Sequence, residues 1–192
     1  MIQKEYNKNW FYLLINILLY HVQLIMSDEK QLEDLLTPYH EIIQIESNKI
    51  YLGNQTAVGA PPDIWNYNEE NIEEISNLLK RLNIKTIICC ADNICKFPND
   101  FTYYQIPARD TPKFNYNDYF DIVADNINNS LKNGNVIIHC NAGVSRSATA
   151  LIAYLIKYQN MNLDDAINHV KSKRSCIDIT NFYDQLKKFK DI

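Results

Sequence analysis

The chain has 192 residues, of which 46% are hydrophobic and 22% are charged, and its formal net charge is −4. This length and composition are typical of one globular domain that buries its own hydrophobic core. The slightly acidic balance excludes the broad basic surface that nucleic-acid-binding proteins use, so we expect no nucleic-acid partner. Any affinity for an anionic substrate must therefore come from a local site.

The cysteine content bears on the compartment and on metal binding. There are five cysteines, Cys89, Cys90, Cys95, Cys140 and Cys176. An odd number, in a chain long enough to fold without disulfides, favours free thiols in a reducing compartment. We expect the cytoplasm, with the nucleus as an alternative. The cysteines and histidines lack the paired spacing of a zinc site, so we expect no metal and no cofactor.

The N-terminal part contains a strongly apolar stretch at residues 10–26, which polar residues interrupt. It is at the short end of the range for a membrane-spanning helix. Three interpretations remain open: a membrane anchor, a helix packed on the domain, or a segment foreign to the natural protein. The polar sequence at residues 26–29 resembles a chain start and favours the third. We assign residues 1–40 to an N-terminal segment, non-native or membrane-associated, and residues 41–192 to the folded domain. Membrane contact is expected only if residues 10–26 are an anchor.

Hydrophobic periodicity then predicts alternating strands and helices. Apolar or alternating runs predict strands at residues 41–46, 49–53, 84–90, 103–106 and 136–138. Apolar positions at helical spacing predict helices at residues 71–82, 116–131, 147–158, 163–173 and 181–190. Asn162 is a predicted N-cap. This order predicts an α/β domain with a mixed, mainly parallel sheet and helices on both faces.

One stretch between the strand at 136–138 and the next helix carries the chemistry: His139-Cys140-Asn141-Ala142-Gly143-Val144-Ser145-Arg146-Ser147. A loop that joins a strand to a helix N-terminus turns several backbone N–H groups toward one point, and the helix dipole adds positive charge there. We therefore predict an anion-binding loop. Its binding groups are the amides of Asn141, Ala142, Gly143, Val144, Ser145 and Arg146, and Gly143 permits the tight curvature.

Cys140, at the base of this loop, is the candidate nucleophile. The loop amides, the helix dipole and Arg146 together favour a thiolate, whose attack on phosphorus would form a phosphocysteine intermediate. Arg146 can donate two parallel hydrogen bonds to phosphoryl oxygens and hold them in the transition state. The alternatives are a buried, inert thiol for Cys140 and a surface arginine capping a helix for Arg146.

The pattern His-Cys-x-x-Gly-x-Ser-Arg-Ser resembles the signature loop of cysteine-dependent protein tyrosine phosphatases. Ser-Arg-Ser-Ala-Thr, with Ala153-Tyr154-Leu155, is similar to the dual-specificity branch. The resemblance implies that residues 41–192 form a dual-specificity phosphatase catalytic domain with a protein tyrosine phosphatase-like fold. It implies hydrolysis of phosphotyrosine and phosphoserine/threonine without a metal, and phosphorylated signalling proteins, kinases among them, as partners.

The same resemblance assigns further residues. Ile-Pro-x-x-Asp resembles the family's acid loop, which makes Asp110 the general acid and then the general base; the chemistry alone does not select it among the 23 acidic residues. Ser147 either donates to the cysteine sulfur, as in the family, or caps the helix. His139 either supports the loop and tunes the thiol or is a structural histidine. The chain departs from the family where Ile179-Thr180-Asn181 replaces the usual Pro-Asn, a difference that concerns how the last helix docks.

Cys90 has two interpretations. It ends a predicted strand that we expect beside the strand leading to Cys140, so a reversible disulfide could protect the nucleophile, as in some relatives. The other interpretation is a buried, inert thiol.

Two alternative functions follow from the same loop. Phospholipid phosphatases of the phosphatidylglycerophosphate or phosphoinositide type also use such loops, but phosphoinositide enzymes tend to carry Lys or Arg inside them. The neutral Asn141, Ala142 and Val144 favour protein substrates instead. A non-catalytic phosphate-binding module is the third possibility, and the presence of both Cys140 and Asp110 argues against it.

Overall fold

The structure is a computed structural model that describes residues 30, 34, 37–59, 69–92 and 96–190. The apolar stretch at residues 10–26 lies outside these described residues. Within them, no helix combines the length and the apolar character that crossing a bilayer requires.

The centre of the fold is a five-stranded sheet with the strand order β1-β2-β5-β3-β4. The strands are β1 (Tyr39–Ile45), β2 (Asn48–Gly53), β3 (Ile84–Cys89), β4 (Thr102–Gln105) and β5 (Asn135–His139). β1 pairs with β2 antiparallel, whereas the β2–β5, β5–β3 and β3–β4 pairs are parallel. The predicted mixed, mainly parallel sheet is therefore confirmed.

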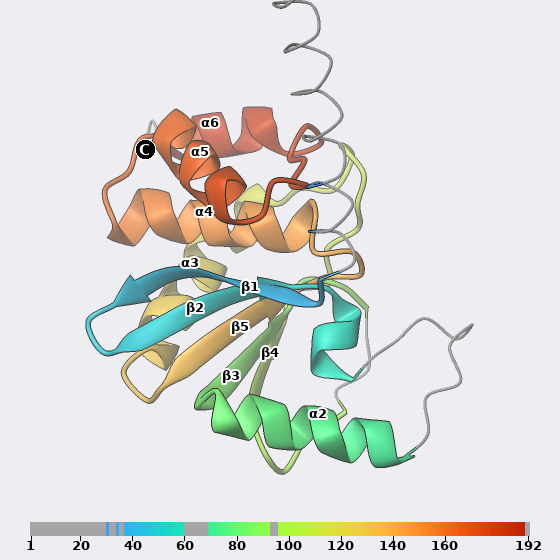
Figure 1. Ribbon diagram of the computed structural model, residues 1–192. Coiled ribbons are helices and arrows are strands. Elements are labelled where there is room, and N and C mark those ends of the chain that lie inside the picture. Colours follow the sequence, from blue (N-terminus) through green and yellow to red (C-terminus); the bar gives the residue numbers. More distant parts are fainter. Residues whose placement is uncertain (1–29, 31–33, 35–36, 60–68, 93–95, 191–192) are drawn as a thin grey trace, which may run out of the picture.

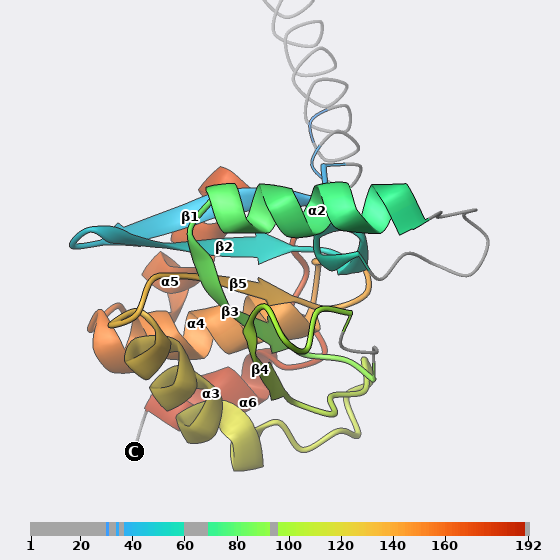
Figure 2. The same cartoon turned by 90° about the horizontal axis from the view of Figure 1, so that it is seen from below.

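Helices cover both faces of this sheet (Figures 1 and 2). One face carries α3 (Asn117–Ser130), α4 (Arg146–Tyr158), α5 (Leu163–Lys173) and α6 (Tyr183–Lys190). The other face carries α2 (Glu69–Arg81) and the short 3-10 helix η1 (Gln55–Val58). The predicted helices are thus present, with ends that differ by at most two residues. Asn162 caps α5 by accepting a hydrogen bond from the Asp165 amide.

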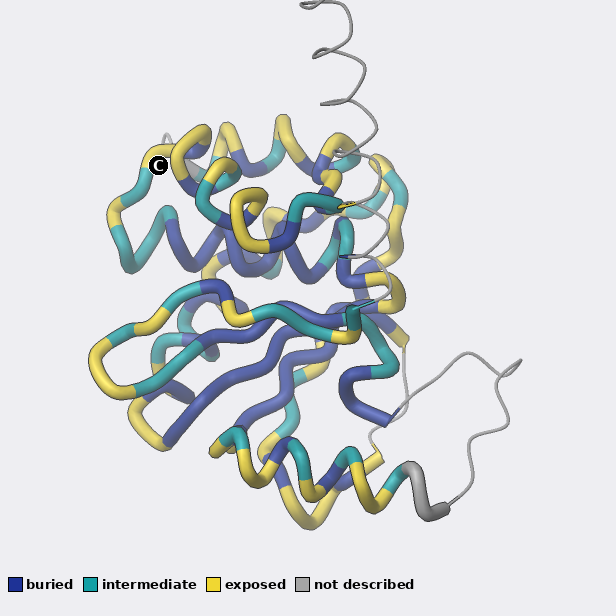
Figure 3. Tube along the Cα trace, viewed as in Figure 1, coloured by how far each residue is buried: buried dark blue, intermediate teal, exposed yellow. Residues whose placement is uncertain are grey.

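The two faces bury separate hydrophobic clusters. Val136 and Ile138 of β5 belong to the cluster beneath α3 to α6, whereas Ile137 between them belongs to the cluster beneath α2. Because successive side chains of a strand alternate between faces, a strand covered on both sides must be apolar throughout. This explains the continuous apolar runs in the sequence, and Figure 3 shows the central strands as buried.

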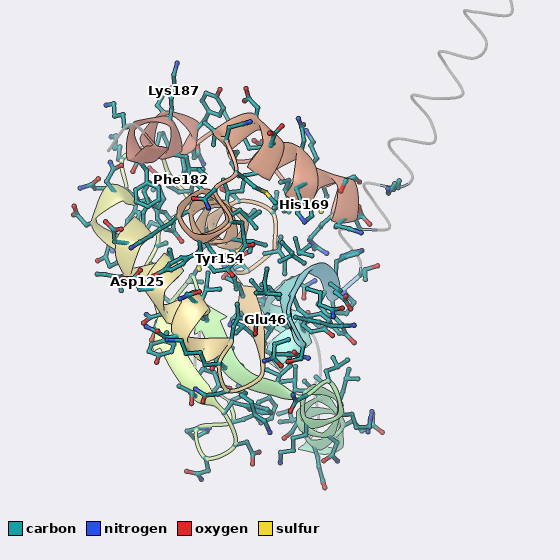
Figure 4. The ribbon with its side chains drawn as sticks, turned by 90° about the vertical axis from the view of Figure 1, so that its left-hand side faces the viewer. Glu46, Asp125, Tyr154, His169, Phe182 and Lys187 are labelled. Carbon is teal, nitrogen blue, oxygen red and sulfur yellow. The ribbon has the colours of Figure 1, made fainter. Side chains whose placement is uncertain are left out.

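The last helix begins later than the sequence predicts. Thr180 donates from its amide and its hydroxyl to Asp178, and the Phe182 amide donates to Ile179. These bonds form a turn before the helix, so α6 starts at Tyr183. Phe182 and Tyr154 of α4 lie inside the helical layer, whereas Lys187 points outward (Figure 4).

The carboxyl ends of the four parallel strands lie at one edge of the sheet. β2 leads there to Asn54, β3 to Cys90, β4 to the loop that contains Asp110, and β5 to Cys140. In α/β sheets this edge is where binding sites form.

Candidate active site

The signature loop joins the end of β5 to the start of α4 at Arg146. Its cysteine lies at the bottom, since Cys140 is 1% exposed. The base of the loop is therefore buried, whereas Asn141 and Ala142 are exposed.

The carbonyl groups of this loop are hydrogen-bonded to donors from other parts of the fold. The donors are the Gln55 amide for Asn141 O (3.1 Å), the Arg174 guanidinium for Ala142 O (3.2 Å) and Gly143 O (2.9 Å), and the Asp178 amide for Val144 O (3.1 Å). In a trans peptide the next N–H points opposite to the carbonyl. With these carbonyls turned outward, the amides of residues 142–145 face the interior of the loop, as anion binding requires.

Gly143 occupies the tightest point of the loop. Its φ of +68° lies in the left-handed region, and a Cβ there would lie 2.6 Å from the Gly53 carbonyl oxygen. Both the backbone conformation and the close approach to the end of β2 therefore require glycine.

Ser147 contacts the sulfur of Cys140. Its hydroxyl, on the first turn of α4, donates to Cys140 Sγ at 3.2 Å, and its side chain is fully buried. The N-cap of α4 is Ser145, whose side chain makes no capping hydrogen bond. Of the two sequence interpretations of Ser147, the geometry agrees with the contact to sulfur.

Arg146 extends from the loop toward the β4–α3 connection. Its Nη1 donates to the Ala108 carbonyl at 3.2 Å, and its Nε lies 3.6 Å from Asp110 Oδ2, an ion-pair distance that is too long for a hydrogen bond. Nε is buried and makes no hydrogen bond with any residue that the structure describes. A buried guanidinium donor without an acceptor is costly, and an oxyanion held by the loop amides is the kind of group that could accept from it.

Asp110 lies against the signature loop although it is distant in sequence. Its Oδ1 accepts hydrogen bonds from Ser145 Oγ (2.8 Å) and from Asn181 Nδ2 (3.1 Å). The Asp110 side chain remains 40% exposed. The acid loop is thus docked on the candidate nucleophile's loop with a carboxyl group that water can reach.

His139 is a buried histidine directly before the nucleophile. It is 2% exposed, and within the described part of the chain its Nδ1 has no hydrogen-bond partner. Burial lowers the pKa of His139 to about 4, although its hydrogen bond with the Cys140 backbone acts in the opposite direction. His139 is therefore neutral at pH 7 and adds no positive charge to the site.

Cys90 lies beside the nucleophile in the sheet register. The last β3–β5 pair is Cys89 with His139, and the Cys90 amide donates to the His139 carbonyl at 2.7 Å, so the next positions are Cys90 and Cys140. Cys90 is a fully buried free thiol, and burial raises its pKa. Tyr116, also fully buried, interacts with Cys90 and donates from its hydroxyl to the Arg146 carbonyl at 3.0 Å.

The structure adds residues that sequence reasoning missed. Asn181, noted only as part of a departure from the family, bonds Asp110, and Arg174 bonds the loop carbonyls. No local pattern marks either residue. Within the described ranges, no group of three or more His, Cys, Asp or Glu side chains is arranged to hold a metal ion.

Comparison with known proteins decides the family. The family model for the dual specificity phosphatase catalytic domain matches residues 64–192. The chain belongs to this family. The resemblance read from the signature loop is therefore confirmed for the dual specificity phosphatase branch.

Relatives and solved structures agree with this assignment. MAP kinase phosphatase with leucine-rich repeats protein 3 of Dictyostelium discoideum is 35% identical over 164 residues, which cover 83% of this chain and 17% of the relative. Dual specificity protein phosphatase 14 of Homo sapiens is 43% identical over 101 residues, 50% of this chain and 51% of the relative. The matches thus span about half the length of dual specificity protein phosphatase 14 and less than a fifth of the Dictyostelium protein.

The crystal structure of human DUSP28 superposes with a TM-score of 0.67 at 20% identity, covering 81% of this chain and 94% of that chain. This likeness shows that the fold is the one common to dual specificity phosphatases. The protein tyrosine phosphatase-like α/β fold expected from the sequence is therefore confirmed.

Proposed function

We propose that the protein hydrolyses phosphotyrosine and phosphoserine/threonine on other proteins through a phosphocysteine intermediate. The observation that carries this proposal is the geometry of the signature loop. Its carbonyls accept hydrogen bonds from donors elsewhere in the fold, and Cys140 lies at its base. Family membership supports phosphatase chemistry in general, and the loop supplies the specific roles.

In the first step, Cys140 Sγ attacks phosphorus and the bond to the substrate oxygen breaks. The inward-facing amides and the Arg146 guanidinium hold the phosphoryl oxygens as charge shifts onto them. Asp110, protonated, gives its proton to the leaving alkoxide or phenoxide. The products of this step are a free hydroxyl group on the substrate and phosphate bonded to Cys140.

In the second step, water attacks the phosphocysteine. Asp110, now ionised, accepts a proton from the water, and the S–P bond breaks to release inorganic phosphate. The hydrogen bond from Ser147 Oγ to Cys140 Sγ stabilises the departing thiolate. His139 is neutral and fully buried; we propose that it supports the loop rather than exchanging protons with the substrate.

Protein substrates are favoured over phospholipids because the loop interior offers no additional cation. Asn141, Ala142 and Val144 are neutral, so a second phosphate on an inositol headgroup would find no charged partner from them. Kinases are a natural substrate class, and the relative named a MAP kinase phosphatase is consistent with this. We further propose that the protein acts in the cytoplasm or nucleus, where its thiols stay reduced.

Turnover of the full chain on phosphotyrosine peptides, phosphothreonine peptides and phospholipid vesicles tests this proposal. We expect hydrolysis of the peptides and loss of all measurable turnover in Cys140→Ser. Cys176→Ser is the matched control, because Cys176 lies outside the loop and should leave the rate unchanged. Full activity in Cys140→Ser contradicts the mechanism, whereas preferred hydrolysis of the vesicles contradicts the substrate class.

We also propose that Cys90 protects Cys140 during oxidation. Peroxide would oxidise the Cys140 thiolate to a sulfenic acid, and the Cys90 thiol would then form a disulfide with it and release water. The adjacent positions in the β3–β5 register support this pairing.

Non-reducing mass spectrometry after mild peroxide treatment checks the redox proposal. We expect a peptide linking Cys90 and Cys140, and activity that a thiol reductant restores. In Cys90→Ser, the same treatment should produce irreversible oxidation of Cys140. Absence of the linked peptide in the wild-type protein contradicts the proposal.

A further inference from the structure

Arg174 is an unusual buried charge behind the signature loop. It follows α5, its side chain is 0% exposed, and it is the largest of the fully buried side chains. Arginine is almost never fully buried without partners, because removing its charge from water is costly. Its surroundings therefore need to supply hydrogen-bond acceptors for the guanidinium group.

One side of the guanidinium group holds the signature loop. Nε donates to Gly143 O at 2.9 Å, and Nη2 donates to Ala142 O at 3.2 Å. These are two successive carbonyls at the point where the loop turns most sharply. Because the peptides are trans, fixing these carbonyls also fixes the direction of the next two amides, those of Gly143 and Val144.

The other side of the guanidinium group is held by the segment that enters the sheet. Nη1 lies 3.0 Å from Thr37 O and 2.9 Å from His40 Nδ1. Guanidinium nitrogens only donate, so His40 Nδ1 must be the acceptor and the proton of the neutral ring lies on Nε2. That Nε2 is 3.1 Å from Asp34 Oδ1, a suitable acceptor.

Asp34 completes the chain of contacts. Its Oδ2 accepts hydrogen bonds from the Ser175 amide at 2.5 Å and the Ser175 hydroxyl at 2.7 Å, and its side chain is nearly buried. Burial acts to raise the pKa of Asp34, but the hydrogen bonds from Ser175 outweigh it and lower this pKa. An ionised Asp34 thus orients His40, which in turn orients Arg174.

We propose that Arg174 is a positioning residue for the phosphate-binding loop, and that Asp34 and His40 hold it in place. The proposal rests on the function proposed above for that loop. Arg174 does not touch the substrate; it keeps the carbonyls of Ala142 and Gly143 turned away so that the neighbouring amides face the anion. Asp34 and His40 precede residue 64, where the family match begins, so part of the machinery lies outside that match.

Inorganic tungstate, a tetrahedral oxyanion, is the probe for this inference, and calorimetric titration of the full chain gives its Kd without turnover. His40→Leu removes one of the two acceptors of Arg174 Nη1 and leaves only Thr37 O. We expect tungstate affinity to fall about tenfold, with a matching rise in KM for a phosphotyrosine peptide. His40→Asn keeps an oxygen near the Nδ1 position, so we expect its affinity to stay within about threefold of the wild type.

Two control variants separate positioning from general destabilisation. Glu41→Gln removes a charge from the same strand, where the exposed Glu41 forms an ion pair with the half-buried Lys49. Leu79→Ala opens a cavity in the cluster on the opposite face of the sheet. We expect both to bind tungstate as the wild type does, although Leu79→Ala melts at a lower temperature.

The outcomes distinguish this inference from the proposed function. Wild-type affinity in His40→Leu, or an equal loss in His40→Leu and Leu79→Ala, overturns the inference even if the enzyme is active. A wild-type protein that binds tungstate but hydrolyses no phosphopeptide overturns the proposed function, while the affinity series still tests Arg174. A wild-type protein that does not bind tungstate overturns both.

Discussion

Asp110 and Arg146 illustrate how a side chain's role depends on partners far away in the sequence. Asp110 is held by Ser145 from the signature loop and by Asn181 from the turn before α6. Arg146 is fixed through the Ala108 carbonyl, which belongs to the acid loop. The Ser145 and Arg146 contacts therefore tie the acid loop to the loop that carries Cys140.

Replacing Asp110 by Asn should slow the first step, and the size of the rate loss should depend on the leaving group. We expect kcat on phosphotyrosine and phosphothreonine peptides to fall roughly 10²–10⁴-fold, because the departing oxygen no longer receives a proton. An aryl phosphate with an acidic phenol needs less protonation, so its loss should be smaller. Asp118→Asn, an exposed aspartate in the first turn of α3, is the control. Equal losses on all substrates would contradict the acid role.

At the scale of residues, the sequence identified which side chains suit the chemistry, but not which side chains contact one another in the fold. Cys140, Arg146 and Ser147 stand in one continuous motif, so their proximity could be predicted. Asp110 required the resemblance, because any acidic residue suits the chemistry. Asn181 could not be chosen at all, since its contact with Asp110 depends on the turn that delays the start of α6.

At the scale of elements, the proposed anion site lies in the loop between β5 and α4. The outward hydrogen bonds of its carbonyls come from the η1 segment, from Arg174 and from the turn before α6. The loop conformation is therefore imposed by its neighbours as well as by its own glycine.

Gly143→Ala tests the loop conformation. The new Cβ would approach the Gly53 carbonyl at 2.6 Å in a left-handed backbone conformation. We expect the free energy of unfolding to fall by about 1–3 kcal/mol. We also expect kcat/KM to fall by roughly 10²-fold, because the amides are displaced. Denaturant titration and steady-state kinetics measure the two effects.

Gly134→Ala is the matched control for this prediction. Gly134 also has a positive φ, +153°, and a Cβ there would meet the Lys85 side chain. It lies before β5, at the end of the strand opposite to Cys140, so it should lower stability but leave kcat/KM unchanged. If both variants lose activity equally, the loop-specific explanation is wrong.

The elements themselves could largely be predicted because hydrophobic periodicity reports burial directly. β3 and β5 are apolar on both faces, and α2 has a single apolar face, so their types were clear from sequence. Strand order could not be predicted this way, because periodicity does not say that β5 lies between β2 and β3.

At the scale of the whole molecule, burial of neutral His139 links stability to pH. The folded protein holds the His139 pKa at about 4, compared with about 6.5 when unfolded. Between these values the unfolded chain binds more protons, so the free energy of unfolding should fall as pH decreases from 6.5 to 4. The contribution is roughly 3 kcal/mol in total.

Urea titrations across this pH range, on the wild type and on His139→Gln, measure this contribution. The carboxyl groups of Asp125 and Asp178, whose pKa values hydrogen bonds lower, lose their contribution only at more acidic pH. The variant should therefore show a clearly shallower slope than the wild type between pH 6.5 and 4. Equal slopes in the two proteins would exclude His139 as the cause.

The sequence also could not predict contacts between residues that lie far apart in the chain. Asp34 and His40 lie in the assigned N-terminal segment, yet they contact Ser175 and Arg174 near the other end of the chain. No periodicity or motif relates residues so far apart. The division at residue 40 stays a prediction, and these contacts show that residues before it join the support of the site.

Trapping the phosphoenzyme tests the central claim most directly. The full chain is mixed with a phosphotyrosine peptide, quenched with acid within milliseconds, digested and mapped by mass spectrometry under conditions that preserve thiophosphates. We predict a phosphate group on the peptide that contains Cys140, and none on this peptide in Cys140→Ser. Rapid turnover with no phosphate on Cys140 at any quench time, or phosphate on another residue, would contradict the account.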